Sequence, residues 1–156
     1  MKSAQEETSS GKRTQMKEST KKWGKPVIDA GFSIIPSVLF KHQRDLELTP
    51  VDLNILLQLA DYWWKANRLP MPAKSTLAKR LGVDPSTIRR HVANLEERGL
   101  IKRVERWDDA KGQRSNEYNL KGLADALHPF AVRANKESKA KKLAKKTASR
   151  TEENNL

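Results

Sequence analysis

Arginine, amide and hydroxyl side chains gather on one face of the helix predicted for residues 85–98. At about 100° per residue, that face carries Ser86, Thr87, Arg89, Arg90, Ala93 and Asn94. An arginine can bond guanine O6 and N7 through two hydrogen bonds, and an asparagine can bond adenine N6 and N7 in the same way. Hydroxyl groups and the amides of a helix N-terminus bind phosphate. This face therefore predicts a surface suited to the major groove of DNA.

The residues around this polar face indicate where the helix begins, ends and packs. Asp84 is a suitable N-cap, and Pro85 fits the first helical position, where a missing N–H costs nothing. Gly99 marks the end of the helix. The opposite face is apolar and consists of Ile88, Val92 and Leu95. We expect this apolar face to be buried, with His91 as a residue at its boundary rather than a metal ligand.

A shorter helix is predicted immediately before it, over residues 75–81. Ser75 is a suitable N-cap, and Gly82 can adopt the left-handed conformation that ends a helix. Its apolar positions are Leu77, Ala78 and Leu81. Two short helices joined by a tight turn form a helix-turn-helix unit, and we count the hydroxyls of Ser75 and Thr76 among the candidate DNA-binding groups.

A β-hairpin is predicted over residues 100–120. Two strand-like runs, LIKRVERW and RSNEYNL, flank the polar loop DDAKGQ, which contains a glycine. Lys111 and Arg114 are candidates for DNA contacts, although Asp108 and Asp109 oppose them in charge. Tyr118 alternates with polar neighbours, which indicates packing on the inner face of the hairpin.

Two adjacent arginines alone would favour a solvated helix surface, but the whole pattern reverses this, because it resembles the winged helix-turn-helix superfamily. The likeness runs from STLAKRLGVDPSTIRRHVANLEERGLIKR to NEYNL. Within it, FSIIPSVLF and YNLKGLADALHPFA are similar to the N-terminal DNA-binding domains of plasmid and phage replication initiators, so the resemblance covers residues 31–131. It implies a mainly α fold with a small β-hairpin wing (α+β). It also implies a transcriptional regulator, or a plasmid or phage replication or maintenance factor, that binds specific sequences of double-stranded DNA. Helix 85–98 would lie in the major groove and the wing 100–120 on the backbone.

A longer helix is predicted over residues 49–67, with Thr49 as N-cap and Asp52 completing a capping box. It is apolar on two sides, so it must be covered on two sides. We expect a homodimer through its second stripe, which consists of Ile55, Leu59, Tyr62 and Ala66. The alternative is that the segment holding Ile34, Val38 and Phe40 covers this stripe within one chain.

Charge and composition separate the predicted domain from its tails. Of the net charge of +12, residues 1–25 hold +4 and residues 132–156 hold +5. We expect residues 1–25 to form a disordered N-terminal tail, residues 26–131 the winged-helix domain, and residues 132–156 a basic C-terminal tail. A short helix over residues 122–127 should end at Pro129. The C-terminal tail has helical propensity, and it either contacts phosphates or serves as a solubilising segment.

Several classes of function find no support in the sequence. Without cysteine, and with three distant histidines, we expect no metal site, and no cofactor or small-molecule substrate is evident. No nucleophile–base pair or glycine-rich phosphate loop is present, so we expect no catalysis. No apolar run approaches the ~18 residues of a membrane span, and we expect a cytoplasmic protein associated with the nucleoid or a plasmid. The alternative function is a non-catalytic protein- or RNA-interaction module that uses the winged helix as a scaffold.

Overall fold

The structure is a computed structural model that describes residues 15–153, and the chain divides into two units that meet between Ile34 and Ile35. In the first unit, residues 15–23 and α2 (Lys25–Asp29) are helical. This corrects the predicted disorder for residues 15–23, whereas residues 1–14 lie outside the described part of the chain. None of these helical residues is buried, so their helices rest on backbone hydrogen bonds and on local pairs such as Lys21 with Glu18 at 2.7 Å.

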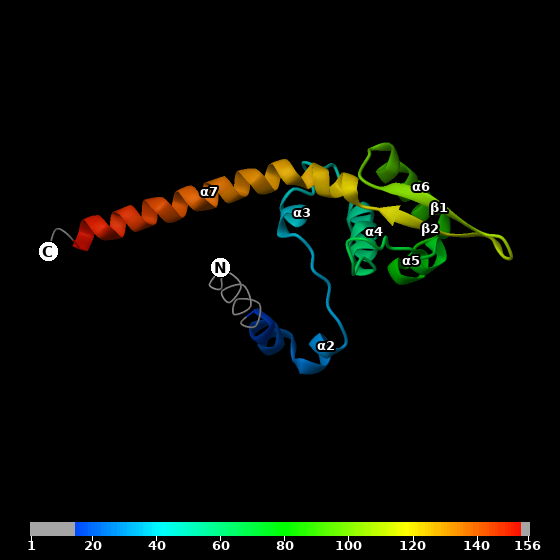
Figure 1. The fold of residues 1–156 in the computed structure, drawn as a ribbon, viewed down its shortest axis with the longest axis horizontal. Coiled ribbons are helices and arrows are strands. Elements are labelled where there is room, and N and C mark those ends of the chain that lie inside the picture. Colours follow the sequence, from blue (N-terminus) through cyan, green and yellow to red (C-terminus); the bar gives the residue numbers. More distant parts are fainter. Residues whose placement is uncertain (1–14, 154–156) are drawn as a thin grey trace. The chain divides into compact units, whose positions relative to one another are not determined.

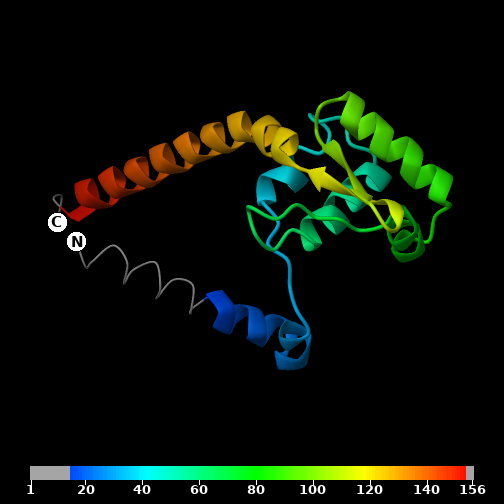
Figure 2. The same ribbon diagram turned by 45° about the vertical axis from the view of Figure 1, so that its right-hand side comes forward.

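The second unit contains five helices and a two-stranded antiparallel sheet within the described residues (Figure 1). Its elements are α3 (Ser37–Lys41), α4 (Pro50–Asp61), α5 (Lys74–Leu81), α6 (Pro85–Glu97), β1 (Lys102–Asp108), β2 (Gly112–Asn119) and α7 (Lys121–Glu153). Figures 1 and 2 show α4, α5 and α6 grouped together with the hairpin alongside. The predicted class, mainly helical with a small hairpin after the helices, is confirmed.

The core of this unit forms where α4, α5 and α6 meet. Its fully buried aliphatic side chains are Ile55, Leu56, Leu59, Leu77, Ile88, Val92 and Leu95. Because Ile55 and Leu59 are inaccessible within a single chain, the predicted dimer interface through this stripe is wrong. The predicted intrachain cover is also only partly right, since Val38 packs against the core but Phe40 is exposed and Ile34 is 87% exposed.

Helix α4 begins as predicted and ends earlier than predicted. The Thr49 hydroxyl accepts a hydrogen bond from the Asp52 amide at 3.1 Å, and the Asp52 carboxylate accepts from the Thr49 amide at 2.9 Å, which completes the capping box. The helix ends at Asp61 instead of residue 67. Beyond the helix, the Pro70 carbonyl accepts a hydrogen bond from the Tyr118 amide at 2.9 Å, which joins the segment after α4 to the hairpin.

Helix α7 continues through Pro129, which corrects the predicted end of a short helix at that residue. Proline removes one helical hydrogen bond, but contacts on both sides of it hold the helix together. Leu123 and Leu127 are buried before the proline, and the Phe130 ring after it stacks on His42 at a centroid distance of 4.2 Å. The residues that follow are rich in alanine and lysine, which favour helix.

The border predicted at residues 131 and 132 therefore falls inside one helix, and the division of the chain into three parts stays a prediction.

Among the helices of residues 15–153, none combines the length and apolar character needed to cross a membrane.

Candidate nucleic-acid interface

The turn between α5 and α6 has the geometry that the sequence predicts. Gly82 adopts the left-handed conformation with φ of 67°, and the Val83 amide donates to the Ala78 carbonyl at 3.1 Å. This six-residue hydrogen bond across a left-handed glycine is a Schellman motif, which ends α5 within one residue. The turn therefore fixes the direction in which α6 leaves α5.

Helix α6 begins at the predicted cap. The Asp84 carboxylate accepts a hydrogen bond from the Ser86 amide at 2.7 Å, and Pro85 occupies the first helical position. Hydrogen bonds from Ser86 lower the pKa of Asp84 below its usual value, and the Ser86 side chain contributes more than the Ser86 amide. The cap therefore carries a negative charge at neutral pH, which suits the positive end of the helix dipole.

The exposed face of α6 holds most of the predicted base-reading side chains. Ser86, Arg89, Arg90, Ala93 and Asn94 are exposed and Thr87 is half-buried, while the opposite face is fully buried. Arg90 and Asn94 form no side-chain hydrogen bond or ion pair with any residue that the structure describes. These two side chains are available for a ligand.

A contact that the sequence does not predict attaches α6 to α4. His91 Nδ1 donates to Asp52 Oδ1 at 2.7 Å, and Asp52 is only 1% exposed. Burial raises the pKa of Asp52, but hydrogen bonds from His91 and Thr49 outweigh burial, and the net effect lowers that pKa. The only signal in the sequence for the contact between His91 and Asp52 is the capping box. The capping box uses one oxygen of the Asp52 carboxylate and leaves the other available.

Two further contacts hold the C-terminal end of α6. The Glu96 carboxylate accepts hydrogen bonds from the Arg103 amide at 2.7 Å and from Arg103 Nε at 2.6 Å, which connects the helix to β1. The Arg98 guanidinium donates to the carbonyls of Leu46 and Glu47 before α4. Together with the His91 contact, these bonds fix both the position of α6 and its rotation about its own axis.

The start of α5 differs from the prediction and adds a functional candidate. The helix begins at Lys74 after Ala73, so Ser75 is not the N-cap, and no side chain caps the first turn. Ser75 is exposed and Thr76 is half-buried. Lys74 was missed because the prediction placed it outside the helix, whereas the structure places it in the first turn beside these hydroxyls.

The hairpin forms the predicted wing. Its strands pair antiparallel from Lys102 opposite Asn119 to Asp108 opposite Gly112, with an irregularity between Val104 and Arg106. Tyr118 is buried on the inner face, as predicted.

Asp108 organises the tip of the wing. Its carboxylate accepts hydrogen bonds from the Ala110 amide at 3.0 Å and from the Lys111 amide at 3.2 Å. It also pairs with the Arg114 guanidinium at 3.0 Å. The hydrogen bond from the Ala110 amide, with smaller contributions from Arg114 and Lys111, lowers the pKa of Asp108. Arg114 is thus partly neutralised, whereas the Lys111 side chain has no ionic partner among residues 15–148.

Comparison with known proteins supports the interpretation of α5 and α6 as a helix-turn-helix unit. Residues 46–101 match a family model described as a helix-turn-helix domain, which covers α4, α5 and α6. The chain carries a winged helix-turn-helix domain. No curated protein matches the sequence.

Several solved structures are similar to this chain, and one of them has a TM-score above 0.5. The N-terminal domain of DnaD protein from Geobacillus kaustophilus HTA426 is similar with a TM-score of 0.51 and 21% identity, over 78% of this chain and 96% of that one. YusO from Bacillus subtilis has a TM-score of 0.42 and 22% identity, over 92% and 85% of the two chains. MepR from S. aureus, solved in complex with DNA, has a TM-score of 0.41 and 20% identity, over 72% and 89%. At these identities the likeness concerns the fold alone.

The basic residues of the helix-turn-helix unit and the wing differ in whether they form ion pairs. Five form ion pairs with carboxylates: Arg80, Arg103, Arg106, Arg114 and Lys121. Lys74, Arg90 and Lys111 have no such partner in the described part of the chain. They lie at the start of α5, on the exposed face of α6 and at the tip of the wing, where a ligand can reach them without breaking an ion pair.

Proposed function

We propose that the protein binds specific sequences of double-stranded DNA, with α6 as the recognition helix in the major groove and the wing on the backbone. The observation that carries the proposal is the exposed face of α6, on which Arg90 and Asn94 have no partner among the residues that the structure describes, while the opposite face is fully buried. A helix held in this way presents its polar side chains without first breaking internal contacts, which reduces the free-energy cost of binding.

The chemistry of this face suits base edges better than phosphates alone. Arginine bonds guanine bidentately and asparagine bonds adenine bidentately, and each such pair contributes about 1–3 kcal/mol of discrimination against the wrong base. Ala93, adjacent to Asn94, is small enough to permit close approach of the helix to the groove. Arg90 and Asn94 are therefore the residues proposed to read sequence.

Other residues are proposed to bind the backbone. Residues 74–121 hold twelve Lys and Arg against seven Asp and Glu, and residues 132–156 hold eight against three. Contacts from such charges to phosphates are independent of sequence and weaken as salt rises. The predicted phosphate contacts are Ser75, Thr76, Ser86, Thr87, Arg89, Lys111 and Arg114.

A biological role is proposed for this binding. We propose a non-catalytic, cytoplasmic factor that acts in transcriptional regulation or in the replication or maintenance of a plasmid or phage. The protein-interaction or RNA-interaction module remains the second candidate, since the basic C-terminal half of α7 suits any acidic partner.

Selection from a random duplex library tests the proposal. The full chain is mixed with the library, bound duplexes are sequenced over several rounds, and affinity is then measured on the enriched duplex, a scrambled duplex and the same sequence as RNA at one salt concentration. We expect a recurring motif and tighter binding to the enriched DNA. Equal affinity for enriched and scrambled DNA, or a preference for RNA, would favour the interaction module.

A further inference from the structure

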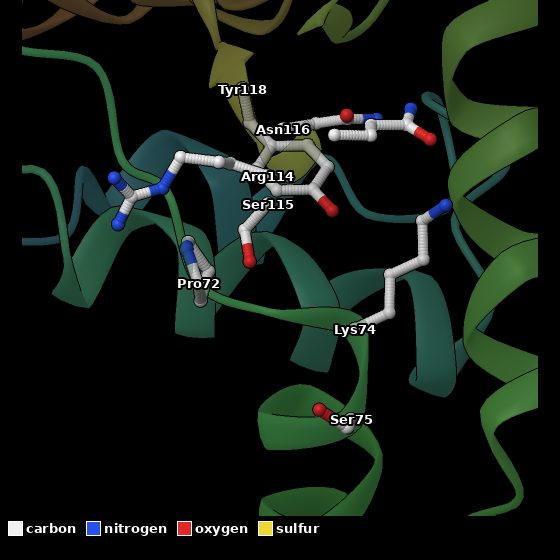
Figure 3. A pocket seen from close by; sticks show the side chains of 8 residues that line it. Pro72, Lys74, Ser75, Arg114, Ser115, Asn116 and Tyr118 are labelled. Carbon is white, nitrogen blue, oxygen red and sulfur yellow. The ribbon is translucent and has the colours of Figure 1, made fainter. Parts of the chain in front are cut away.

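A hollow of about 320 Å³ lies between the start of α5 and the strand β2. The residues around it that bear polar side chains are Lys74, Ser75, Gln113, Arg114, Ser115, Asn116 and Tyr118. Figure 3 shows these side chains, with the Tyr118 hydroxyl pointing toward the side on which Lys74 and Ser75 lie. No carboxylate lines the hollow. Its chemistry therefore favours an anion over a cation.

Tyr118 has a polar group that packing does not explain. Its side chain is 1% exposed, and its hydroxyl forms no hydrogen bond with any residue in the described part of the chain. A phenylalanine would fill the same space in the core, and the Tyr118 hydroxyl is not among the buried polar atoms that lack a partner, so it is open to solvent at the hollow. Burial raises the pKa of Tyr118, so the hydroxyl keeps its proton at neutral pH and acts as a donor.

The facing wall of the hollow also supplies donors. No side chain caps the first turn of α5, so the amides of this turn are left for another acceptor. Lys74 contributes a positive charge with no carboxylate partner among residues 15–148, and Ser75 contributes an exposed hydroxyl. Arg114 contributes less, because its guanidinium pairs with Asp108 at 3.0 Å.

These groups match a single tetrahedral anion. Neutral donors come from two sides, one lysine supplies the charge, and the helix N-terminus adds a favourable dipole. A phosphodiester carries one negative charge and two exposed oxygens, so it can accept from both walls at once. The wing, α5 and α6 are grouped together in the winged-helix domain (Figure 1).

We propose that this hollow binds one phosphate of the DNA backbone, with Tyr118, Ser75 and the α5 amides donating to its oxygens and Lys74 supplying the charge. The inference rests on the proposed function, and it gives Tyr118 a binding role beyond packing. A phosphate held between α5 and the wing would also fix the register of the duplex, because its position sets how far α6 enters the groove.

The test uses the full chain, the variants Tyr118→Phe and Lys74→Gln, and the control Lys79→Gln, which removes an exposed lysine of α5 that does not line the hollow. Tyr118→Phe should bind enriched and scrambled duplexes about two- to tenfold more weakly, as expected for one lost hydrogen bond, with an unchanged salt dependence. Lys74→Gln should reduce the slope of log affinity against log salt by about 0.9, as expected for one lost phosphate contact, whereas Lys79→Gln should not.

Neutral methylphosphonates placed one at a time along the enriched duplex identify the phosphate. At one position, the methylphosphonate should weaken binding by wild-type protein but should weaken binding by Tyr118→Phe much less. The reason is that the methylphosphonate and the substitution remove the same contact. If Tyr118→Phe and Lys74→Gln bind like wild type at every position while Arg90→Ala loses specificity, the hollow is not a phosphate site and the proposed function stands. If wild-type protein binds no duplex, both proposals fall. Should Tyr118→Phe fail to fold in a thermal melt, Lys74→Gln with the methylphosphonate series decides the question.

Discussion

His91 on α6 and Asp52 on α4 form a hydrogen bond of 2.7 Å between Nδ1 and Oδ1. The same carboxylate caps α4 by accepting from Thr49, so one buried group holds the start of α4 and the middle of the proposed recognition helix. Since the residues are 39 positions apart in sequence, the bond closes a long loop. The orientation of the polar face of α6 therefore depends on a side chain that does not lie on that face.

Replacing Asp52 tests this contact through stability. The folded-state pKa of Asp52 is lowered, so its contribution is complete above the ordinary value of 3.8 and is lost as pH falls through the folded-state pKa. Asp52→Asn should lower the free energy of unfolding by about 1–3 kcal/mol at neutral pH, because it weakens hydrogen bonds to a buried charge. Urea unfolding between pH 7 and pH 3 should also show a shallower acid decline for the variant.

The control for this experiment is Asp125→Asn, which removes an exposed carboxylate paired only with Lys121. It should change stability little, since exposed ion pairs contribute about 0–1 kcal/mol. Equal stability of Asp52→Asn and wild type across the pH range would mean that the Asp52–His91 bond does not support the domain.

A close backbone contact at the start of α7 gives a second prediction. A Cβ on residue 122 would lie 1.9 Å from the Gly99 carbonyl oxygen, which is backbone and cannot rotate away. Gly122→Ala should therefore destabilise the domain by about 1–3 kcal/mol, as overpacking does. Thermal melts should show the loss, with the exposed neighbour Lys121→Ala as control. A melting temperature equal to that of wild type would show that α7 can shift without cost.

Leu59→Glu distinguishes the intrachain core from the dimer interface predicted for the same stripe. Leu59 is 0% exposed, so a carboxylate there lacks both water and a partner, and the domain should unfold. Trp64→Glu, at a residue that is 71% exposed, should leave the fold intact. Circular dichroism and light scattering provide the measurements. If wild-type protein is a dimer and Leu59→Glu is a folded monomer, the result would support the predicted dimer interface.

The elements that the sequence predicts well are those that local chemistry determines. Asp84 and Pro85 start α6, Gly82 ends α5, and the alternation around Tyr118 places its ring inside the wing. Each of these features depends on residues a few positions apart, where capping, φ preference and side-chain periodicity act directly. The polar face of α6 follows from them, so its residues were identified from sequence alone.

The features that the sequence does not predict depend on contacts between distant segments. Helical periodicity shows that α4 is apolar on two sides, but not that one chain covers it. The packing of Phe130 on His42 helps α7 to continue through Pro129. The hollow beside Tyr118 forms only when α5 and β2 come together.

Removing the basic end of α7 tests its contribution to DNA binding. Deletion of residues 132–156 should weaken binding to enriched and scrambled duplexes by similar factors and reduce the slope of log affinity against log salt, because lysines on phosphates release counterions without reading bases. Specificity should persist. Titrations at several salt concentrations measure both quantities, and an unchanged slope would assign this segment to solubility or to a protein partner.

The central claim is that α6 reads base edges, and the comparison of Arg90→Ala with wild type on enriched and scrambled duplexes at one salt concentration tests it most directly. Arg44→Ala, which removes an exposed arginine outside the helix-turn-helix unit and the wing, is the matched control. Arg90→Ala should lose about 1–3 kcal/mol on the enriched duplex, lose much less on the scrambled one, and tolerate changes at one or two base pairs that wild type rejects. Equal losses on both duplexes would make Arg90 a phosphate contact and contradict the claim.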